Sequence, residues 1–313
     1  RACRGQRFRR HGVSPARKSS RAFSPGTGID ADYKSPDLPI EHMYDTVLIP
    51  TDGSEGAVGA ARHGIAVAAA CGATVHVLNV VDTRAFSEAL ADIDDLARRG
   101  REALERRGHD AVGEIEALAG RSGVEVVSSV EEGRPYEIVR EYAERHGIDL
   151  IAMGTHGRTG IERFLLGSVA ERIVRSSPVP VLTARDGTEE ESPAYGDVLI
   201  ATDGSETALA AADHGVDLAR RFDATVHAVH VVTVPSPSID DDDLIYEEVF
   251  DALEEDGRAF VGEVAARAEE AGVEAVTAVA RGTPARRLGR YVEEHGIDLV
   301  AMATHGRTGV ERY

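Results

Sequence analysis

The chain has 313 residues, of which 42% are hydrophobic, and this is enough for two globular domains with cores of their own. Residues 1–42 carry nine basic and four acidic side chains, so the remaining body, 43–313, has 26 basic and 50 acidic side chains and a net charge of −24. Such an acidic body excludes duplex nucleic acid as a natural partner, and no apolar run approaches the length that a membrane span needs.

The composition also indicates the surroundings of the protein. Both lysines, Lys18 and Lys34, lie in the first 42 residues, so the basic residues of the body are all Arg. Dense carboxylates keep a surface hydrated, and this pattern predicts a halophilic protein. The two cysteines, Cys3 and Cys71, are too few for a disulfide framework and favour a cytoplasmic location. We expect Cys71 to be a small buried hydrophobe, because Phe222 holds the matching place in the repeat described below.

Residues 1–42 are rich in Arg, Ser, Pro and Gly and show little apolar periodicity, which predicts a disordered basic tail. Arg9-Arg10 is similar to a twin-arginine export signal, but the apolar segment that such a signal needs is missing. Met43 stands directly before the first predicted strand. We therefore expect the natural chain to begin there and the tail to be non-native.

Strands and helices alternate along the first half of the body. The first strand, over 44–49, leads to a turn in which Ser54 is the expected N-cap of a helix that ends at Gly72. The later predicted elements are a strand over 74–81, a helix over 87–120, a strand over 124–130, a helix from Pro135 to Gly147, a strand over 148–153, a helix over 168–176 with Ser168 as its N-cap, and a fifth strand over 178–183. Pro178 and Pro180 confine the fifth strand to a sheet edge. This alternation predicts an α/β fold with a doubly wound parallel sheet.

The same pattern begins again after a polar linker over 187–194. Val198 to Glu206 repeats Val47 to Glu55 at an offset of 151. A period of about 150 residues is a whole domain, and the sequence therefore predicts tandem domains over 43–186 and 195–313. The second copy reaches Tyr313 without a counterpart of the last helix and fifth strand, so we expect it to be an incomplete domain.

A glycine-rich loop follows the fourth predicted strand. Gly154 and Gly157 allow a ligand to approach the backbone, and Gly167-Ser168 begins a helix whose positive end favours an anion. Strand, glycine loop and helix together indicate a phosphate site. In the second copy Ala303 replaces the first glycine and the Gly-Ser pair is missing, so we expect a phosphate-bearing ligand to bind only in the first copy.

The spacing of these glycines resembles the nucleotide-binding signature of the universal stress protein family. The resemblance covers nearly all of 43–186 and, less completely, 195–313. It implies the strand order 3-2-1-4-5 of an adenine nucleotide alpha hydrolase-like fold, and an ATP-binding stress-response protein with little or no catalysis that binds Mg²⁺ together with the nucleotide. The residues that match the family's contacts are Pro50, Thr51, Asp52, Val80, Met153, Gly154, His156, Gly157, Gly167, Ser168 and Val169.

The resemblance also implies a partner. Universal stress proteins typically pair through their fifth strands, and only one such strand is present in this sequence. We therefore expect a homodimer through Val179 to Thr183, with the second copies hanging outward and partly unfolded.

Other functions remain open at this point. As an alternative to a binding role, Asp52 caps the first helix, because Asp is common beside a helix start. The matching alternative for His156 is an exposed side chain without a ligand. An enzyme on a related scaffold, either ATP pyrophosphatase-like or flavin-dependent, is one alternative, although Thr51-Asp52-Gly53-Ser54 fits neither phosphate loop well. The sequence also lacks a Walker-type Gly-Lys-Ser/Thr motif. A ligand-free dimerisation module is a further alternative, which suits the second copy.

Overall fold

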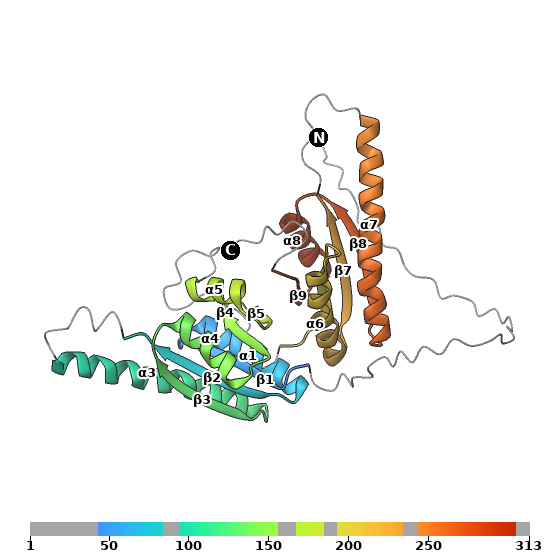
Figure 1. The fold of residues 1–313 in the computed structure, drawn as a ribbon. Helices are drawn as coiled ribbons and strands as arrows, with labels where there is room; N and C mark the ends of the chain where they lie inside the picture. The colour runs from blue at the N-terminus through green and yellow to red at the C-terminus, as the bar shows by residue number, and fades with distance from the viewer. Residues whose placement is uncertain (1–42, 84–93, 156–166, 185–192, 234–242, 305–313) are drawn as a thin grey trace, which may run out of the picture.

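The computed structural model describes residues 43–83, 94–155, 167–184, 193–233 and 243–304. The predicted tail, 1–42, lies outside the described residues, as does the middle of the glycine-rich loop. The described residues form two α/β domains, each built on a parallel sheet of its own (Figure 1).

The first domain contains a five-stranded parallel sheet. Its order is β3-β2-β1-β4-β5, which confirms the predicted order 3-2-1-4-5. The elements in chain order are β1 (Thr46–Thr51), α1 (Glu55–Cys71), β2 (Thr74–Val81), α3 (Asp94–Arg121), β3 (Val126–Glu132), α4 (Pro135–His146), β4 (Leu150–Gly154), α5 (Ser168–Ser176) and β5 (Val181–Ala184).

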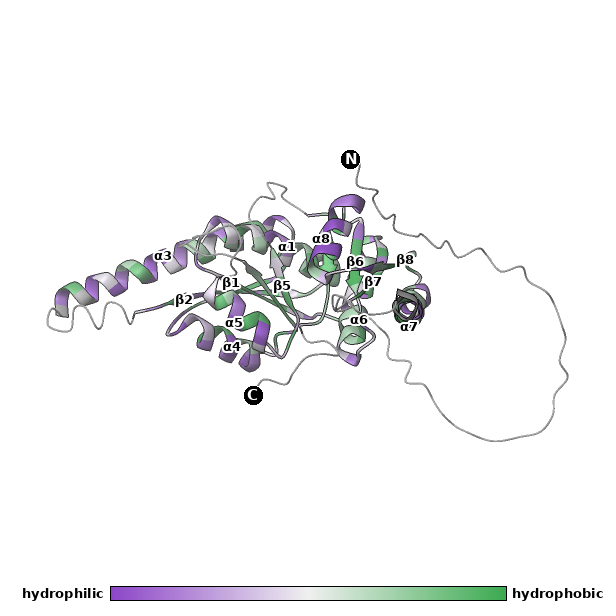
Figure 2. Ribbon diagram, turned by 90° about the horizontal axis from the view of Figure 1, so that it is seen from above, coloured by the Kyte–Doolittle hydropathy of each residue, from purple (hydrophilic) through white to green (hydrophobic). Residues whose placement is uncertain are grey.

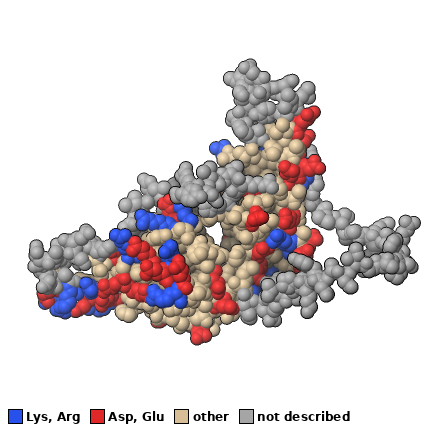
Figure 3. Space-filling view, in the orientation of Figure 1, with Lys and Arg blue, Asp and Glu red and all other residues tan. Residues whose placement is uncertain are grey.

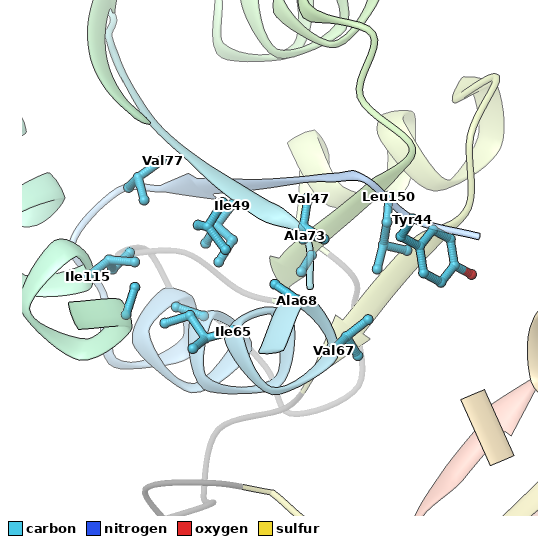
Figure 4. Packing of buried hydrophobic residues seen from close by; sticks show 14 of the residues in the cluster. Tyr44, Val47, Ile49, Ile65, Val67, Ala68, Ala73, Val77, Ile115 and Leu150 are labelled. Carbon is cyan, nitrogen blue, oxygen red and sulfur yellow. The ribbon is translucent and has the colours of Figure 1, made fainter. Parts of the chain in front are cut away.

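Helices cover both faces of this sheet, because successive residues of a strand point to opposite sides. Val47 lies on one face, in the same hydrophobic cluster as Ile65 of α1 and Ile115 of α3 (Figure 4). Leu48, the next residue, packs on the other face with side chains of α4 and α5, among them Tyr142. The sheet is thus the middle of three layers, as a doubly wound fold requires.

Small side chains let α1 approach the sheet closely. A β carbon on Gly64 would lie only 2.7 Å from the β carbon of Ala152 in β4. Cys71, at the end of the same helix, is buried as predicted, and burial raises the pKa of its thiol to about 11.

The second domain repeats this plan with four parallel strands in the order β8-β7-β6-β9. Its elements are β6 (Asp197–Ala201), α6 (Glu206–Phe222), β7 (Thr225–Val232), α7 (Asp243–Glu270), β8 (Ala275–Arg281), α8 (Pro284–His295) and β9 (Leu299–Ala301). β9 is an edge strand here, whereas its counterpart β4 lies between two strands. Val300 is consequently 41% exposed, while the equivalent Ile151 is 1% exposed.

The two domains pack on each other through α1 and α6. The hydroxyl of Tyr44 hydrogen-bonds Nδ1 of His214, and the hydroxyl of Tyr195 hydrogen-bonds Nδ1 of His63. The guanidinium of Arg221 in α6 also donates a hydrogen bond to the backbone carbonyl oxygen of Ala70 in α1. The expectation that the second copy hangs outward is therefore wrong, because its buried side chains complete the core of the first.

Several predicted boundaries differ from the structure by a few residues, among them those of the fifth strand and of the long helix. The fifth strand begins at Val181 and not at Pro178, because Pro178 and Pro180 have no N–H to donate to a ladder. The carbonyl of Pro180 still accepts a hydrogen bond from Ile151. The helix predicted over 87–120 is described from Asp94 to Arg121, and its first predicted residues lie outside the described part.

Candidate functional site

The carboxyl ends of β1, β2 and β4 meet at one edge of the first sheet. β1 pairs with β2 so that Thr51 lies opposite Asn79. It pairs with β4 so that Leu48 lies opposite Ile151, and the same register continued along the strand brings Thr51 beside Gly154. In open α/β sheets, ligands bind beyond these strand ends, where the strand order reverses.

The turn between β1 and α1 is held by its own polar side chains. Oγ1 of Thr51 accepts a hydrogen bond from the N–H of Gly53, and Oδ1 of Asp52 accepts one from the N–H of Ser54, at 3.1 and 3.0 Å. Ser54 caps α1, as predicted, by accepting from the N–H of Ala57. Gly53 has φ +74°, a backbone conformation that favours glycine. One carboxylate oxygen of Asp52 therefore shapes the turn.

Sequence reasoning missed Asn79, which is 6% exposed and lies directly below this turn. Its side-chain amide donates to the carbonyl oxygen of Thr51 at 2.8 Å. In the second domain, Nδ1 of His230 hydrogen-bonds the carbonyl oxygen of Thr202 at the same distance. A polar residue at the same place near the ends of two mostly apolar strands is the signal that could have indicated this role.

Gly154 lies at the point where β4 reaches the first turn of α1. A β carbon here would lie 2.8 Å from the carbonyl carbon and oxygen of Gly56, so a larger residue would push the strand end away from α1. The glycine therefore has a packing role that does not depend on any ligand. It also brings the loop after β4 next to the turn after β1.

The start of α5 differs from the prediction. Gly167, with φ −59° and ψ 147°, is the N-cap, and Ser168 is the first helical residue. Within the described residues no side chain caps this end, because glycine has none to offer. The first N–H groups of a helix have no partner within it. Because Gly167 hydrogen-bonds Thr155, which directly follows β4, the start of α5 lies at the strand ends.

Backbone hydrogen bonds close the glycine-rich loop at its base. The N–H of Gly167 donates to the carbonyl oxygen of Thr155 at 2.7 Å, and the N–H of Thr155 donates to that of Ala184 in β5. The two ends of the loop are thereby held beside the sheet. His156 and Gly157, which the sequence places in this loop, lie outside the described residues.

The remaining predicted site residues form an apolar floor. Met153 is buried, and Val80 and Val169 are half-buried against the same hydrophobic cluster on the α4 and α5 face. Pro50 is half-buried at the end of β1. The structure thus brings all the described candidates to one edge of the sheet. The apolar side chains pack into the hydrophobic cluster there, and the polar side chains lie in the turns that follow the strands.

The second domain has the same turn but a different surrounding. Oδ1 of Asp203 accepts from the N–H of Ser205 at 3.0 Å, as Asp52 does for Ser54. However, the ring of Phe260 lies against Gly204, where a β carbon would be 2.3 Å from the ring. β9 also ends at Ala301, two residues before Ala303, the position that matches Gly154. β4 reaches Gly154 through its pairing with β5, whereas β9 pairs only with β6 among the described strands, which is the physical reason for the shorter strand.

Neither a metal-binding cluster nor a membrane-spanning helix occurs among the described residues. No three His, Cys, Asp or Glu side chains within the described ranges converge in a way that could hold a metal ion. Among the described helices, none has the length and apolar character needed to cross a membrane.

Comparisons with known proteins agree with this architecture. The sequence profile of the universal stress protein family matches residues 43–185 and 194–313. Universal stress protein MJ0531 of Methanocaldococcus jannaschii is 38% identical over 155 residues, which are 48% of this chain and 87% of that protein. Putative universal stress protein SH1215 of Staphylococcus haemolyticus is 35% identical over 150 residues, covering 47% of this chain and 87% of the relative.

A solved structure matches both domains together. The crystal structure of a universal stress protein from Archaeoglobus fulgidus covers 82% of this chain and 86% of its own, with a TM-score of 0.59 and 22% identity. At this identity the likeness concerns the fold alone.

Proposed function

Because the chain belongs to the universal stress protein family, we propose that its first domain binds ATP at the edge formed by β1, β2 and β4. The nucleotide base lies on the apolar floor of Val80 and Met153. The ribose and phosphates lie between the turn at Asp52 and the start of α5. The protein acts in a stress response by binding the nucleotide.

One observation carries this proposal. α5 begins at Gly167 without a side-chain cap, and the loop before it is tied to the sheet through Thr155. A helix start of this kind offers backbone N–H groups and a positive dipole end, which suit phosphate oxygens. By contrast, the hydroxyl of Ser54 accepts a hydrogen bond from one of the corresponding N–H groups of α1, that of Ala57. The residues present therefore fit a phosphate chain.

A divalent ion would accompany the nucleotide. Mg²⁺ is commonly held by one or two carboxylates together with phosphate oxygens and water. Two described carboxylates lie at this edge: Asp52 is half-buried in the turn after β1, and Asp82 is half-buried directly after β2. The ion would thus depend mostly on the phosphates for its ligands.

We assign little or no catalysis to this site. The described residues at the edge are hydroxyls, amides, glycines, apolar side chains and the carboxylates of Asp52 and Asp82, and Asp52 is already engaged in the turn. A general base needs a titratable group within hydrogen-bond reach of the reacting atoms. The two cysteines and the buried thiol of Cys71 support a reducing, cytoplasmic compartment for this function.

The second domain is proposed not to bind ATP. Phe260 lies against the turn after β6, and Ala303 stands in place of Gly154. The ring of Phe260 covers the backbone of Gly204, and the side chain of Ala303 stands where the first domain has only the backbone of Gly154.

Calorimetric titration with MgATP tests this proposal. We expect one equivalent of ATP per chain, and at about a hundredfold excess over Kd a stabilisation of roughly 2.7 kcal/mol, or a melting shift of several degrees. Gly157→Val should abolish binding because a side chain blocks approach to the backbone. Gly306→Val is the matched control at the equivalent position of the second copy and should leave binding unchanged.

The same samples separate the alternatives. Binding of two equivalents, or equal loss of binding in both variants, would contradict a single site in the first domain. A visible absorbance spectrum would indicate a flavin protein, and rapid release of pyrophosphate would indicate an ATP pyrophosphatase. A chain that binds no nucleotide would be a ligand-free module.

We further propose a homodimer through the β5 edge, over Val179 to Thr183. β5 is the last strand of its sheet, and an edge strand offers unpaired backbone groups. Thr183 is exposed, so Thr183→Lys adds a charge there without disturbing the half-buried Val181. We expect this variant to be monomeric by light scattering in 0.5 M KCl. Val127→Lys, on the opposite edge strand β3, is the matched control and should remain dimeric. A monomeric parent protein would contradict this interface.

A further inference from the structure

Asn79 is a polar residue that the fold of the first domain buries. Charged side chains of this domain lie on its surface, where red and blue atoms are mixed (Figure 3). Asn79, in β2, is by contrast only 6% exposed. Burying an amide costs free energy unless the amide is hydrogen-bonded, so its place in a mostly apolar strand needs a physical reason.

The side chain of Asn79 lies between helix α3 and the turn after β1. α3 packs on β2 and β3 (Figures 1 and 2). A β carbon on Gly108 of this helix would lie 2.5 Å from Oδ1 of Asn79. The amide nitrogen of the same side chain donates to the carbonyl oxygen of Thr51 at 2.8 Å. The glycine thus leaves the room that the amide needs to reach the turn.

This hydrogen bond fixes the orientation of one peptide group. A peptide bond is planar and trans, so its carbonyl oxygen and its N–H point in opposite directions. The carbonyl of Thr51 points to Asn79 and therefore toward β2. β1 lies between β2 and β4, so the N–H of Asp52, in the same peptide, points to the side of β4. Gly154 and the start of α5 lie on that side, where the nucleotide is proposed to bind.

The second domain contains the same hydrogen bond, made by a different residue. Nδ1 of His230 hydrogen-bonds the carbonyl oxygen of Thr202 at 2.8 Å, the distance that is found in the first domain. A β carbon on Gly257, which matches Gly108, would lie 2.6 Å from Cδ2 of His230. The two copies therefore share the bond to this carbonyl and not the residue that makes it.

The surroundings of the two side chains also match. Cγ1 of a valine lies near the β carbon placed on each helix glycine, at 3.1 Å for Val130 and at 3.3 Å for Val279. The two turns have the same shape, since Gly53 and Gly204 both have φ +74°. A histidine at position 79 would thus have the space and the partner that His230 has in the second domain.

From these contacts we infer that Asn79 is a positioning residue for the nucleotide site of the first domain. Its amide holds the Thr51–Asp52 peptide in the orientation that the ligand meets, and Gly108 keeps α3 from displacing the amide. The inference rests on the proposed function, because it concerns the same site. Asn79 acts through the turn and not by touching the nucleotide.

Titration of the full chain with MgATP tests this inference. Asn79→Leu leaves the carbonyl of Thr51 without its buried partner, so we expect the Kd to rise roughly tenfold. Asn79→His should restore a Kd within about threefold of the parent value, because His230 makes the same bond in the second domain.

Two glycine variants crowd the supporting side chain without replacing it. Gly108→Ala places a β carbon against the amide of Asn79 and should raise the Kd severalfold. Gly257→Ala is the matched control. It crowds His230 in the same way, but in the domain that is proposed not to bind ATP, so the Kd should stay unchanged.

A further variant separates positioning from a general loss of stability. Ile115 belongs to the same helix, α3, and is fully buried. Ile115→Val should lower the melting temperature without changing the Kd, since it removes only core packing. Circular dichroism gives the temperature range in which each variant is folded, and the titrations are performed within the range that all share.

The outcomes distinguish this inference from the proposed function. A parent chain that binds no MgATP would overturn both. If the parent binds and folded Asn79→Leu has the same Kd, the inference alone is overturned. The same holds if Asn79→His binds as weakly as Asn79→Leu, or if Ile115→Val weakens binding as much. Should Asn79→Leu fail to fold, the glycine variants decide, and equal Kd values for Gly108→Ala and Gly257→Ala would overturn the inference.

Discussion

The hydroxyl of Tyr44 lies 2.8 Å from Nδ1 of His214, and the two rings stack with their centroids 5.7 Å apart. Tyr44 precedes β1 in the first domain, and His214 belongs to α6 in the second. The same contact occurs in reverse, since the hydroxyl of Tyr195 lies 2.6 Å from Nδ1 of His63. Both tyrosines and both histidines are related by the offset of 151 that relates the copies. The domains therefore meet as a self-complementary pair, in the manner of a two-fold dimer.

We call the contact between the two domains through these two tyrosine–histidine pairs the domain boundary. Removing either hydroxyl should weaken this boundary. Tyr44→Phe and Tyr195→Phe each delete one hydrogen bond to a histidine, which costs about 0.5–1.5 kcal/mol in the free energy of unfolding. Denaturant unfolding of each variant measures that loss. Tyr136→Phe is the control, because its hydroxyl forms an exposed hydrogen bond to Ser176 and should change stability by less than about 0.5 kcal/mol. Equal effects of all three substitutions would contradict a special role for the boundary.

The boundary should also weaken in mild acid. Burial lowers the pKa of His63, and burial lowers the pKa of His214 despite the nearby carboxylates of Asp213 and Asp217. Above the usual His pKa of about 6.5, both residues are neutral whether folded or unfolded, and the stability is fully present. As the pH falls below this value, the unfolded chain binds protons first, so stability decreases until the folded histidines protonate as well.

Unfolding at pH 7.5, 6.5 and 5.5 measures this slope. Replacing His63 and His214 with Gln should make stability less dependent on pH, because Gln can bond the tyrosine hydroxyl without titrating. The slope should not vanish, since His76, whose pKa is lowered by burial and by His146, responds in the same direction. An unchanged slope in the double variant would show that the boundary histidines are not responsible.

Gly154→Ala should destabilise the first domain. The added β carbon would lie 2.8 Å from the carbonyl group of Gly56, and overpacking of this kind typically costs about 1–3 kcal/mol. Gly113→Ala is the control, because its β carbon would meet nothing within 4 Å and alanine is the better helix former. We expect that variant to gain roughly 0.5–1 kcal/mol in thermal or denaturant unfolding. A neutral Gly154→Ala would mean that β4 and α1 can separate freely.

Salt should stabilise the acidic body. Residues 43–313 have a net charge of −24, and screening reduces the repulsion among their carboxylates. We expect the melting temperature to rise markedly between about 0.1 M and molar KCl. Glycerol at matched water activity serves as a control for general solvent effects. A melting temperature that is indifferent to salt would contradict the prediction of a halophilic surface.

The sequence by itself determined the plan of each domain. Hydrophobic runs of four to eight residues and their glycine punctuation identified the strands and helices, because these are local properties of the chain. The offset of 151 identified the duplication, and the capping role of Ser54 followed from its place before a helix. Strand ends were less well predicted. The start of β5 depended on which N–H groups the prolines remove, and the cap of α5 at Gly167 depended on backbone angles.

Only the tertiary structure decided what lies next to what. That Gly154 contacts Gly56, that Asn79 supports the carbonyl of Thr51, and that Phe260 covers Gly204 are contacts between residues far apart in the sequence. The pairing of Tyr44 with His214 spans 170 residues, so neither the helical nor the strand periodicity of the sequence indicates it. Periodicity reports which face of an element is buried, but not which element buries it, because that choice depends on packing between distant parts of the chain.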